Sequence, residues 1–372
     1  MKIMQILPEF EEGGVERHVL WLSNELASRG HEVTVVSAGG KLESQLDGRV
    51  KHRRLPVHLK NPATAAWCAL KIARFARNDK YDLMHAHSRV PAWITWWASS
   101  ISKTPWVITA HDNYRRNRAL YPFRYADTVI CVSRSVKEHL ERFIPEESHV
   151  IYNGMPGNYG KWDGTARKGP KRLLFLGRIT RRKGLQVVLE ALGDFRQKDW
   201  ILDVVGDGPL RGDLENMALE LGIASKVSFH GFRDDTEKWM KQCDLFLFPS
   251  LDEGMGLTLM QAVYMGVPVL ASDLPPVREL SSDGGNSLVT AGDTKAWKQR
   301  IDNILCGEKD FSFFDRSKVL TVKDTCPLIE EVYLEILRKG HSNATGIEKT
   351  GPAQKVNPGE SSSQEEESHG RI

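Results

Sequence analysis

Two basic residues stand five positions apart in the segment GRITRRKGL, directly after an apolar run. Arg178 follows the run RLLFLG, and Lys183 precedes Gly184, which opens an amphipathic stretch typical of a helix. Arginine grips a phosphate with two parallel hydrogen bonds and lysine acts as a point charge, so this spacing at a helix start suits a pyrophosphate. Arg181 and Arg182 are alternative binders, and a solvated basic loop is the remaining interpretation.

A second segment, EGMGLTLMQ, begins with an acid in a glycine-rich turn. Glu253 stands in that turn, and Gln261 stands eight residues later on a run of good helix formers. The pattern is typical of a ligand site, yet the polar group at its far end is neutral. From the residues alone, Gln261 belongs to a working site, to an altered site or to an ordinary helix surface.

Glycines follow two other apolar runs. Gly13 and Gly14 precede a helical pattern, where paired glycines let backbone N–H groups approach an anion, although a plain tight turn is the alternative. In VVGDGPLRGDL the glycines Gly206, Gly208 and Gly212 have the spacing GxGxxxG rather than GxGxxG, and no acid ends the next strand pattern. We interpret that segment as a structural turn and not as a dinucleotide site.

Three histidines lie at the ends of apolar strand patterns. His111 ends PWVITAH and is followed by Asp112, which could orient its ring, while His85 and His87 belong to YDLMHAH. A histidine in such a place is often only a packing residue, so we rank His111 first and His87 well below it. The sequence has no DxD segment between apolar strand residues and no His, Cys or carboxylate cluster with metal-ligand spacing, so we expect no metal.

The elements that must position these residues form two similar series. Short apolar runs alternate with amphipathic stretches, which predicts an α/β chain with parallel sheets. Residues 1–154 are expected as one Rossmann-like domain and residues 172–322 as another, joined by a Gly- and Pro-rich linker at 155–171. Residues 323–338 are expected as a helix that packs back on the first domain, and residues 339–372 as a disordered tail. Ligands of open α/β sheets bind at the carboxyl ends of the strands, so a cleft between the domains is the expected site.

Composition narrows the class of protein further. The chain has 372 residues, 41% hydrophobic and 27% charged, which is ordinary for a soluble protein and long enough for two cores. We expect a cytoplasmic protein, because no apolar run approaches the roughly 18 residues that span a bilayer and the five cysteines are scattered. Residues 1–154 carry 22 Lys and Arg against 16 Asp and Glu, which favours an anionic partner such as a phosphorylated substrate or a lipid surface. An uneven but solvated surface is the alternative.

Several segments together resemble a known family. The chain is similar to family 4 of the retaining glycosyltransferases, and in particular to its bacterial cell-envelope enzymes, which have the GT-B fold of two Rossmann-like domains facing each other across a cleft. The likeness rests on GGVE at 13–16, ITAHD at 108–112, VIYNG at 150–154, GR…KG at 177–184, VVGDGP at 204–209 and PS…EGMG…QA…GVPV at 249–269. These motifs occur in the family's order over nearly all of residues 1–338.

The resemblance implies a donor site in the second domain. Arg178 and Lys183 would hold the diphosphate of a nucleotide-sugar, and Glu253 would contact the sugar hydroxyls. Gln261 stands where the family normally has a second Glu that accepts hydrogen bonds from the ribose, which implies weaker or retuned nucleoside recognition rather than loss of chemistry. The backbone amides beside sugar and phosphate would come from the turn residues Gly254, Met255, Gly256 and Leu257.

The resemblance also implies an acceptor side in the first domain. His111 would lie near the reacting sugar and is, with Glu253, the expected catalytic residue. Gly14 belongs to a loop that closes over the phosphate or the acceptor. Further candidates on the acceptor side are Gly13, Glu16 and His87.

We therefore predict a retaining glycosyltransferase that moves a hexose from a nucleoside-diphosphate sugar to a cell-envelope glycan or lipid-linked acceptor, without a metal, another cofactor or a nucleic-acid partner. Because no convincing carboxylate nucleophile is present, the expected route is a same-face displacement in which the leaving phosphate takes the acceptor's proton. Trp93, Trp96 and Trp97 have helical spacing, and they either place the first domain peripherally on the inner face of an anionic membrane or pack in a core. The alternatives are a nucleotide-sugar-binding protein without transferase activity and a nucleotide-sugar hydrolase or epimerase.

Overall fold

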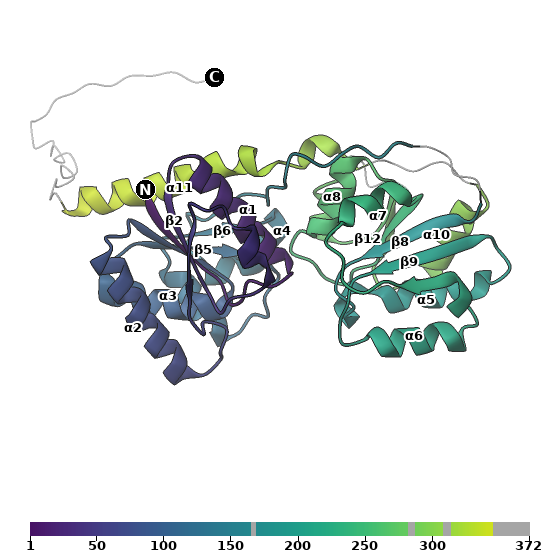
Figure 1. Cartoon of the computed structure of the whole chain (residues 1–372), viewed down its shortest axis with the longest axis horizontal. Coiled ribbons are helices and arrows are strands. Elements are labelled where there is room, and N and C mark those ends of the chain that lie inside the picture. The colour runs from purple at the N-terminus through teal and green to yellow at the C-terminus, as the bar shows by residue number, and fades with distance from the viewer. Residues whose placement is uncertain (165–168, 282–286, 308–313, 345–372) are drawn as a thin grey trace, which may run out of the picture.

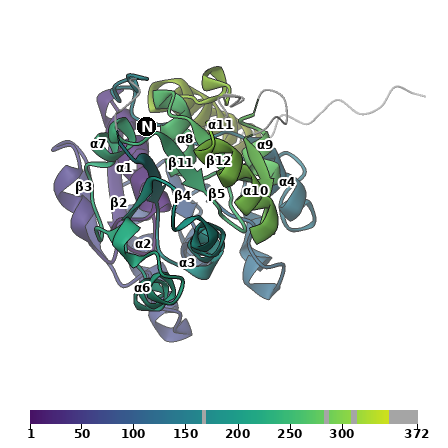
Figure 2. The same ribbon diagram turned by 90° about the vertical axis from the view of Figure 1, so that its right-hand side faces the viewer.

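The protein consists of two α/β lobes, each built on one parallel sheet (Figure 1). This computed structural model describes residues 1–164, 169–281, 287–307 and 314–344. In Figure 2 the second lobe lies in front of the first, so the lobes are arranged end to end along the long axis of Figure 1. The architecture confirms the predicted pair of Rossmann-like domains.

The first domain has a parallel sheet in the order β3-β2-β1-β4-β5-β6-β7. Its strands are β1 Lys2–Ile6, β2 Glu32–Ser37, β3 Lys51–Arg54, β4 Leu83–His87, β5 Trp106–Ala110, β6 Thr128–Cys131 and β7 His149–Val150. Its helices and 3-10 turns are α1 Gly14–Ser28, η1 Lys41–Gln45, α2 Pro62–Asn78, α3 Arg89–Ser102, η2 Arg118–Tyr125, α4 Arg134–Leu140 and η3 Glu141–Phe143. Strands β4, β5 and β6 are buried along their whole length, as expected where helices cover both faces of a parallel sheet.

The second domain repeats this design with the order β10-β9-β8-β11-β12-β13. Its strands are β8 Lys171–Leu176, β9 Trp200–Val205, β10 Val227–Phe229, β11 Leu245–Phe248, β12 Val269–Asp273 and β13 Leu288–Thr290. Its helices and 3-10 turns are η4 Arg181–Lys183, α5 Leu185–Leu192, η5 Gly193–Phe195, α6 Arg211–Glu220, η6 Ala224–Lys226, α7 Thr236–Gln242, α8 Leu257–Met265, α9 Pro275–Arg278, α10 Thr294–Leu305 and η7 Arg316–Lys318.

Both sheets reverse their strand order at the place where candidate residues lie. In the first sheet the order reverses between β1 and β4, and His87 is the last residue of β4. In the second sheet it reverses between β8 and β11, and Arg178 and Glu253 stand in the loops that follow these strands. Such topological switch points are where open α/β sheets bind their ligands.

The segment VVGDGP packs against the loop after β8. A Cβ atom on Gly206 would overlap the carbonyl oxygen of Gly177, and one on Gly208 would overlap that of Ile179. Gly206 also has a φ of 139°, a conformation that favours glycine. Close backbone packing therefore explains these glycines, in agreement with the interpretation as a structural turn.

The last helix returns to the first domain. Helix α11, Val322–Ala344, runs along that lobe beside α1 (Figure 1). Glu330 accepts a hydrogen bond of 3.0 Å from Nε of Arg29 and lies 2.6 Å from Nε2 of His31. The helix continues past Arg338, the expected boundary, to Ala344, so the first residues of the expected tail are helical. The rest of that tail, 345–372, lies outside the described residues.

Candidate active site

The loops after β8 and β11 bring the predicted diphosphate and sugar residues together. Nζ of Lys183 forms an ion pair with Oε1 of Glu253. Oγ of Ser250 donates a hydrogen bond of 2.8 Å to the same carboxylate oxygen. Only 6% of Glu253 is exposed, and burying a charged group is costly unless it is paired and hydrogen-bonded. Lys183 and Glu253 therefore form one electrostatic unit in the second domain.

The turn after Glu253 fits closely against the first domain. A Cβ atom on Gly254 would overlap the carbonyl oxygen of His111, so only glycine allows this approach. Met255 is buried, and Gly256 has the positive φ of 78° that begins helix α8 at Leu257. The predicted donor turn thus lies beside the main chain of His111 and presents the N-terminus of a helix, which favours an anion.

The paired glycines of the first domain face the same turn. A Cβ atom on Gly14 would lie 3.5 Å from Cδ1 of Leu257, across the boundary between the domains. The Glu16 carboxylate folds back over Gly13. Burial raises the pKa of Glu16, while the positive charge of Arg178 on the second domain acts in the opposite direction. Arg178 is exposed, and within the described residues it forms no ion pair, so its charge is available to a ligand.

His111 is oriented by His87 and not by Asp112. Nε2 of His111 lies 3.0 Å from Nδ1 of His87. Asp112 instead forms a two-pronged ion pair with the guanidinium of Arg182, whose Nε also donates 2.9 Å to the carbonyl of Asp252. The prediction that Asp112 orients His111 is therefore wrong, because a cation from the other domain binds that carboxylate. Arg182, an alternative phosphate binder in the sequence, is committed to this interdomain contact.

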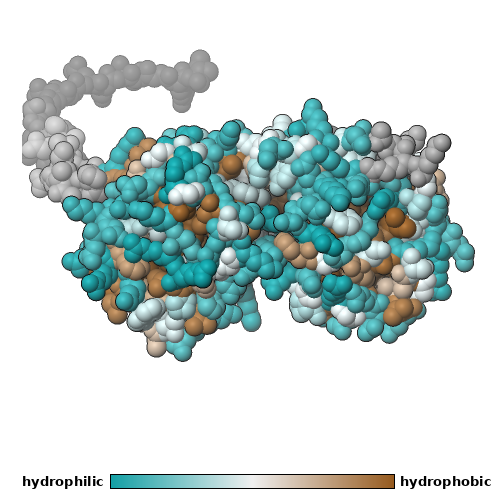
Figure 3. Space-filling view, in the orientation of Figure 1, coloured by the Kyte–Doolittle hydropathy of each residue, from teal (hydrophilic) through white to brown (hydrophobic). Residues whose placement is uncertain are grey.

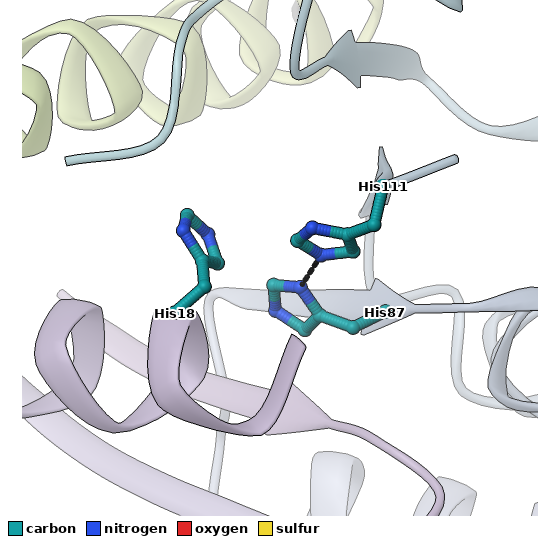
Figure 4. Close-up of side chains that lie close together, drawn as sticks. All are labelled: His18, His87 and His111. Carbon is teal, nitrogen blue, oxygen red and sulfur yellow. Dashed lines mark hydrogen bonds between the residues drawn. The ribbon is translucent and has the colours of Figure 1, made fainter. Parts of the chain in front are cut away.

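Three histidines, which we call the histidine wall, lie close together in the first domain where it meets the second (Figure 4). His18 points from α1 toward His87 and His111, with its ring centroid 5.0 Å from that of His111. Burial lowers the pKa of all three imidazoles, that of His18 to about 4, so they are neutral at pH 7. The sequence indicates His111 and His87 as candidates, but not His18 or the group as a whole. Their separation along the chain gave no metal-ligand spacing, and only the fold brings them together.

Gln261 is enclosed by its own domain. Its side chain is 4% exposed, and its Nε2 donates 2.9 Å to Oγ1 of Thr236 at the start of α7. The partner that the amide required is therefore Thr236, a residue that the sequence did not single out. Thr236 and Gln261 therefore form a polar pair about one turn along α8 from the donor turn.

The tryptophan stripe packs against its neighbours. Trp93, Trp96 and Trp97 are all partly buried, and Trp96 stacks on Tyr125 with ring centroids 5.0 Å apart. A more exposed apolar pair lies on α2, where Trp67 is 47% and Leu70 is 60% exposed. None of the helices that the structure describes is long and apolar enough to cross a membrane.

These features define a class of enzyme. Two parallel-sheet domains hold a basic, glycine-rich site on one side of their boundary and the histidine wall on the other, and this pair of domains has the architecture of the GT-B fold of glycosyltransferases. The family model described as Glycosyltransferase Family 4 matches residues 12–156, and the model described as Glycosyl transferases group 1 matches residues 161–312. The chain belongs to family 4 of the glycosyltransferases.

Two relatives of similar sequence are named as glycosyltransferases. The chain is 27% identical over 311 residues to a lipopolysaccharide core biosynthesis glycosyltransferase of Rhizobium meliloti, covering 79% of this chain and 86% of the relative. It is 29% identical over 332 residues to a phosphatidyl-myo-inositol mannosyltransferase of Mycobacterium leprae, covering 80% and 85%.

Solved structures share the fold. A glycosyltransferase from Rickettsia africae matches with a TM-score of 0.76 and 22% identity, over 91% of this chain and 98% of that one. The Anabaena protein HepE, solved with UDP and glucose, matches with a TM-score of 0.70 and 21% identity, over 93% and 100%.

Proposed function

We propose that this protein is a retaining glycosyltransferase that moves a hexose from a nucleoside-diphosphate sugar to a cell-envelope glycan or lipid-linked acceptor. The observation that carries the proposal is the ion pair of the partly exposed Lys183 with the buried Glu253, which lies next to the helix-starting turn that approaches the main chain of His111. A cation, a carboxylate and backbone amides in this arrangement support the proposal, because they are the groups that a sugar phosphate would require.

The second domain supplies the charges for the leaving group. Arg178 and Lys183 stabilise the departing nucleoside diphosphate, and the N-terminus of α8 adds the favourable end of its dipole. Glu253 accepts hydrogen bonds from sugar hydroxyls once Lys183 turns to the phosphate. The anomeric C–O bond to the phosphate breaks while the acceptor oxygen approaches from the same face, and the leaving phosphate takes the acceptor's proton.

The first domain positions the sugar and does not add charge to the site. Its neutral His111 lies beside the donor turn and accepts or donates a hydrogen bond to the sugar without adding charge to the site. Closure of the domains, through the ion pair of Asp112 with Arg182, excludes water from the reacting sugar. We propose that transfer is independent of metal, because Arg178 and Lys183 provide the positive charge that a metal would otherwise supply.

The proposed acceptor class rests on the relatives and on the first domain. One relative is named for lipopolysaccharide core biosynthesis and another for mannosyl transfer to a phosphatidyl-inositol. Exposed Trp67 and Leu70 share the outer face of α2 with exposed Lys71 and Arg74, which suits the inner, anionic face of a membrane. Figure 3 shows that exposed apolar residues lie among hydrophilic ones over this lobe.

A vesicle experiment tests the membrane part. We expect the protein to sediment with anionic vesicles, and Trp67→Ser combined with Leu70→Ser to abolish sedimentation. Leu219→Ser is the matched control, because Leu219 is 64% exposed on α6 of the second domain. Equal sedimentation of all three proteins would contradict membrane contact through α2.

Ligand-induced stabilisation tests the donor. A ligand that binds only the folded protein raises its Tm. We expect one member of a panel of UDP-, GDP- and ADP-sugars to raise the Tm of the wild-type protein and to leave that of the Arg178→Ala, Lys183→Ala double variant unchanged. If no nucleotide-sugar raises the Tm, the donor site is wrongly assigned. Binding followed by release of free sugar, without transfer, would favour a hydrolase.

A further inference from the structure

The histidine wall has the dimensions of a metal site. His18, His87 and His111 each offer a ring nitrogen, and these atoms all lie within 4.8 Å of one another (Figure 4). The closest pair, Nδ1 of His87 and Nε2 of His111, is 3.0 Å apart. Two nitrogens bound at 2.0–2.1 Å to a tetrahedral zinc ion lie about 3.3 Å apart, so small side-chain movements suffice to seat an ion.

The hydrogen-bond partner of His87 determines which of its two ring nitrogens carries the proton. Nε2 of His87 lies 2.7 Å from Oε1 of Gln5, and a carbonyl oxygen can only accept a hydrogen bond. Nε2 therefore carries the proton of the neutral ring, and the lone pair is on Nδ1, which faces His111. Gln5 is fully buried and is itself held by the hydroxyl of Tyr333 at 3.3 Å. Metal-binding histidines are commonly oriented by a carbonyl in this way.

His18 supplies an independent observation. Its side chain is 6% exposed, and its Nε2 is buried without a hydrogen-bond partner in the part of the chain that the structure describes. Buried polar atoms without a partner are rare, and each one requires an explanation. The ring of His18 faces the other two histidines, so an ion among them would satisfy this nitrogen.

We propose that His18, His87 and His111 bind one zinc ion and leave its fourth position to water or to a ligand in the cleft. Imidazole ligands suit zinc, and three protein ligands with one open position are typical of zinc sites that are not purely structural. The site does not serve transfer. On the proposed function, which places His111 beside the reacting sugar, bound zinc occupies this ring and inhibits the enzyme.

Metal binding at this site can be measured with Co²⁺ in the absence of substrate, because tetrahedral Co²⁺ absorbs visible light. We expect untagged, EDTA-stripped protein to bind one Co²⁺ per chain with a tetrahedral spectrum, and zinc to displace it. His18→Ala and His111→Gln should each weaken Co²⁺ binding at least about tenfold, and Gln5→Leu, which removes the orienting carbonyl, by about 10–100-fold. His230→Ala is the matched control, because His230 pairs with Asp203 in the second domain.

The outcomes separate the metal site from the proposed function. The absence of a tetrahedral spectrum from the wild-type protein, or an undiminished spectrum in both His18→Ala and His111→Gln, would overturn the metal site whatever the transfer assay shows. In that assay, zinc should inhibit the wild-type enzyme by at least about tenfold and the His18→Ala variant by less. Zinc that binds but leaves transfer unchanged would overturn the inhibitory role.

Discussion

The two sides of the domain boundary, which we call its two walls, differ in charge. The second-domain wall is charged: Arg178 is exposed, and Lys183 is paired with the buried Glu253. The histidine wall of the first domain is neutral, because burial lowers the pKa of His87 and His111 well below the ordinary value. On the proposed function, one wall would balance the charge of a diphosphate, while the other would position groups at the sugar without adding charge.

The largest effect should follow from removing the charges of the second wall. Arg178→Ala combined with Lys183→Ala should lower the initial rate of transfer at least about 10³-fold, because one electrostatic donor is typically worth 10²–10³. Arg181→Ala is the control, since Arg181 is exposed in the same loop, and it should stay within a few-fold of wild type. Double-variant turnover near that of the control would remove the charged wall from the mechanism.

A smaller and different effect is expected on the neutral wall. His111→Ala should lower kcat by about 10²-fold, as for a group that acts near the reacting atoms, and leave the affinity for the nucleoside diphosphate nearly unchanged. Calorimetric titration with the diphosphate, set beside steady-state kinetics, separates the two quantities. If both walls change affinity equally, the division between them fails.

Substitutions at Gln261 test whether this residue contributes to binding of the nucleoside diphosphate. Gln261→Glu should tighten nucleoside diphosphate binding by about fivefold, since a charge-assisted hydrogen bond to the ribose is stronger than a neutral one by roughly 1 kcal/mol. The hydroxyl of Thr236 can still donate to the new carboxylate. Gln261→Ala is the comparison and should bind more weakly. Unchanged calorimetric affinity in both variants would show that residue 261 does not touch the nucleoside.

The smallest effect concerns the helix that supports the neutral wall. Burial opposes ionisation of Glu330, but hydrogen bonds from Arg29 and His31 outweigh it and lower the pKa of Glu330. A lowered pKa contributes stability above pH 4.5, and this stability is lost as the pH falls through the pKa of the folded protein. Glu330→Gln should therefore reduce the free energy of unfolding by about 1 kcal/mol at pH 7.

Denaturant unfolding of wild type and Glu330→Gln between pH 7 and pH 3 measures this loss. The difference between the two proteins should shrink below pH 4.5. A difference that stays constant over this range would mean that the carboxylate charge does not hold α11 on the first domain.

The sequence predicts the charged wall better than the neutral one. Arg178 and Lys183 share one loop, and Glu253 starts a local motif, so their neighbourhood depends on short stretches whose spacing is visible. His18, His87 and His111 come from three elements, and only the strand order of the sheet brings them together. Local patterns determine elements, whereas contacts between distant elements depend on packing.

Contacts between distant elements also explain other differences between the predictions from the sequence and the structure. The partner of Asp112 could not be read from its neighbour His111, because Arg182 reaches it from the other domain. Thr236 meets Gln261 only because α7 and α8 are adjacent in the fold. The sequence does not predict the end of α11 at Ala344, because the apolar stripe fades after Arg338 although the backbone remains helical.

The central claim is that the charged wall activates a nucleotide-sugar and the neutral wall directs its sugar to an acceptor. The most direct measurement uses the nucleotide-sugar that raises the Tm, labelled in its sugar, as donor and a cell-envelope lipid extract as acceptor. EDTA is present, and the label is followed into the products. We predict label in the extracted glycan or lipid with an unchanged anomeric configuration, and loss of this product in the Arg178→Ala, Lys183→Ala variant. Label recovered only as free sugar, or only in intact donor, would contradict the claim.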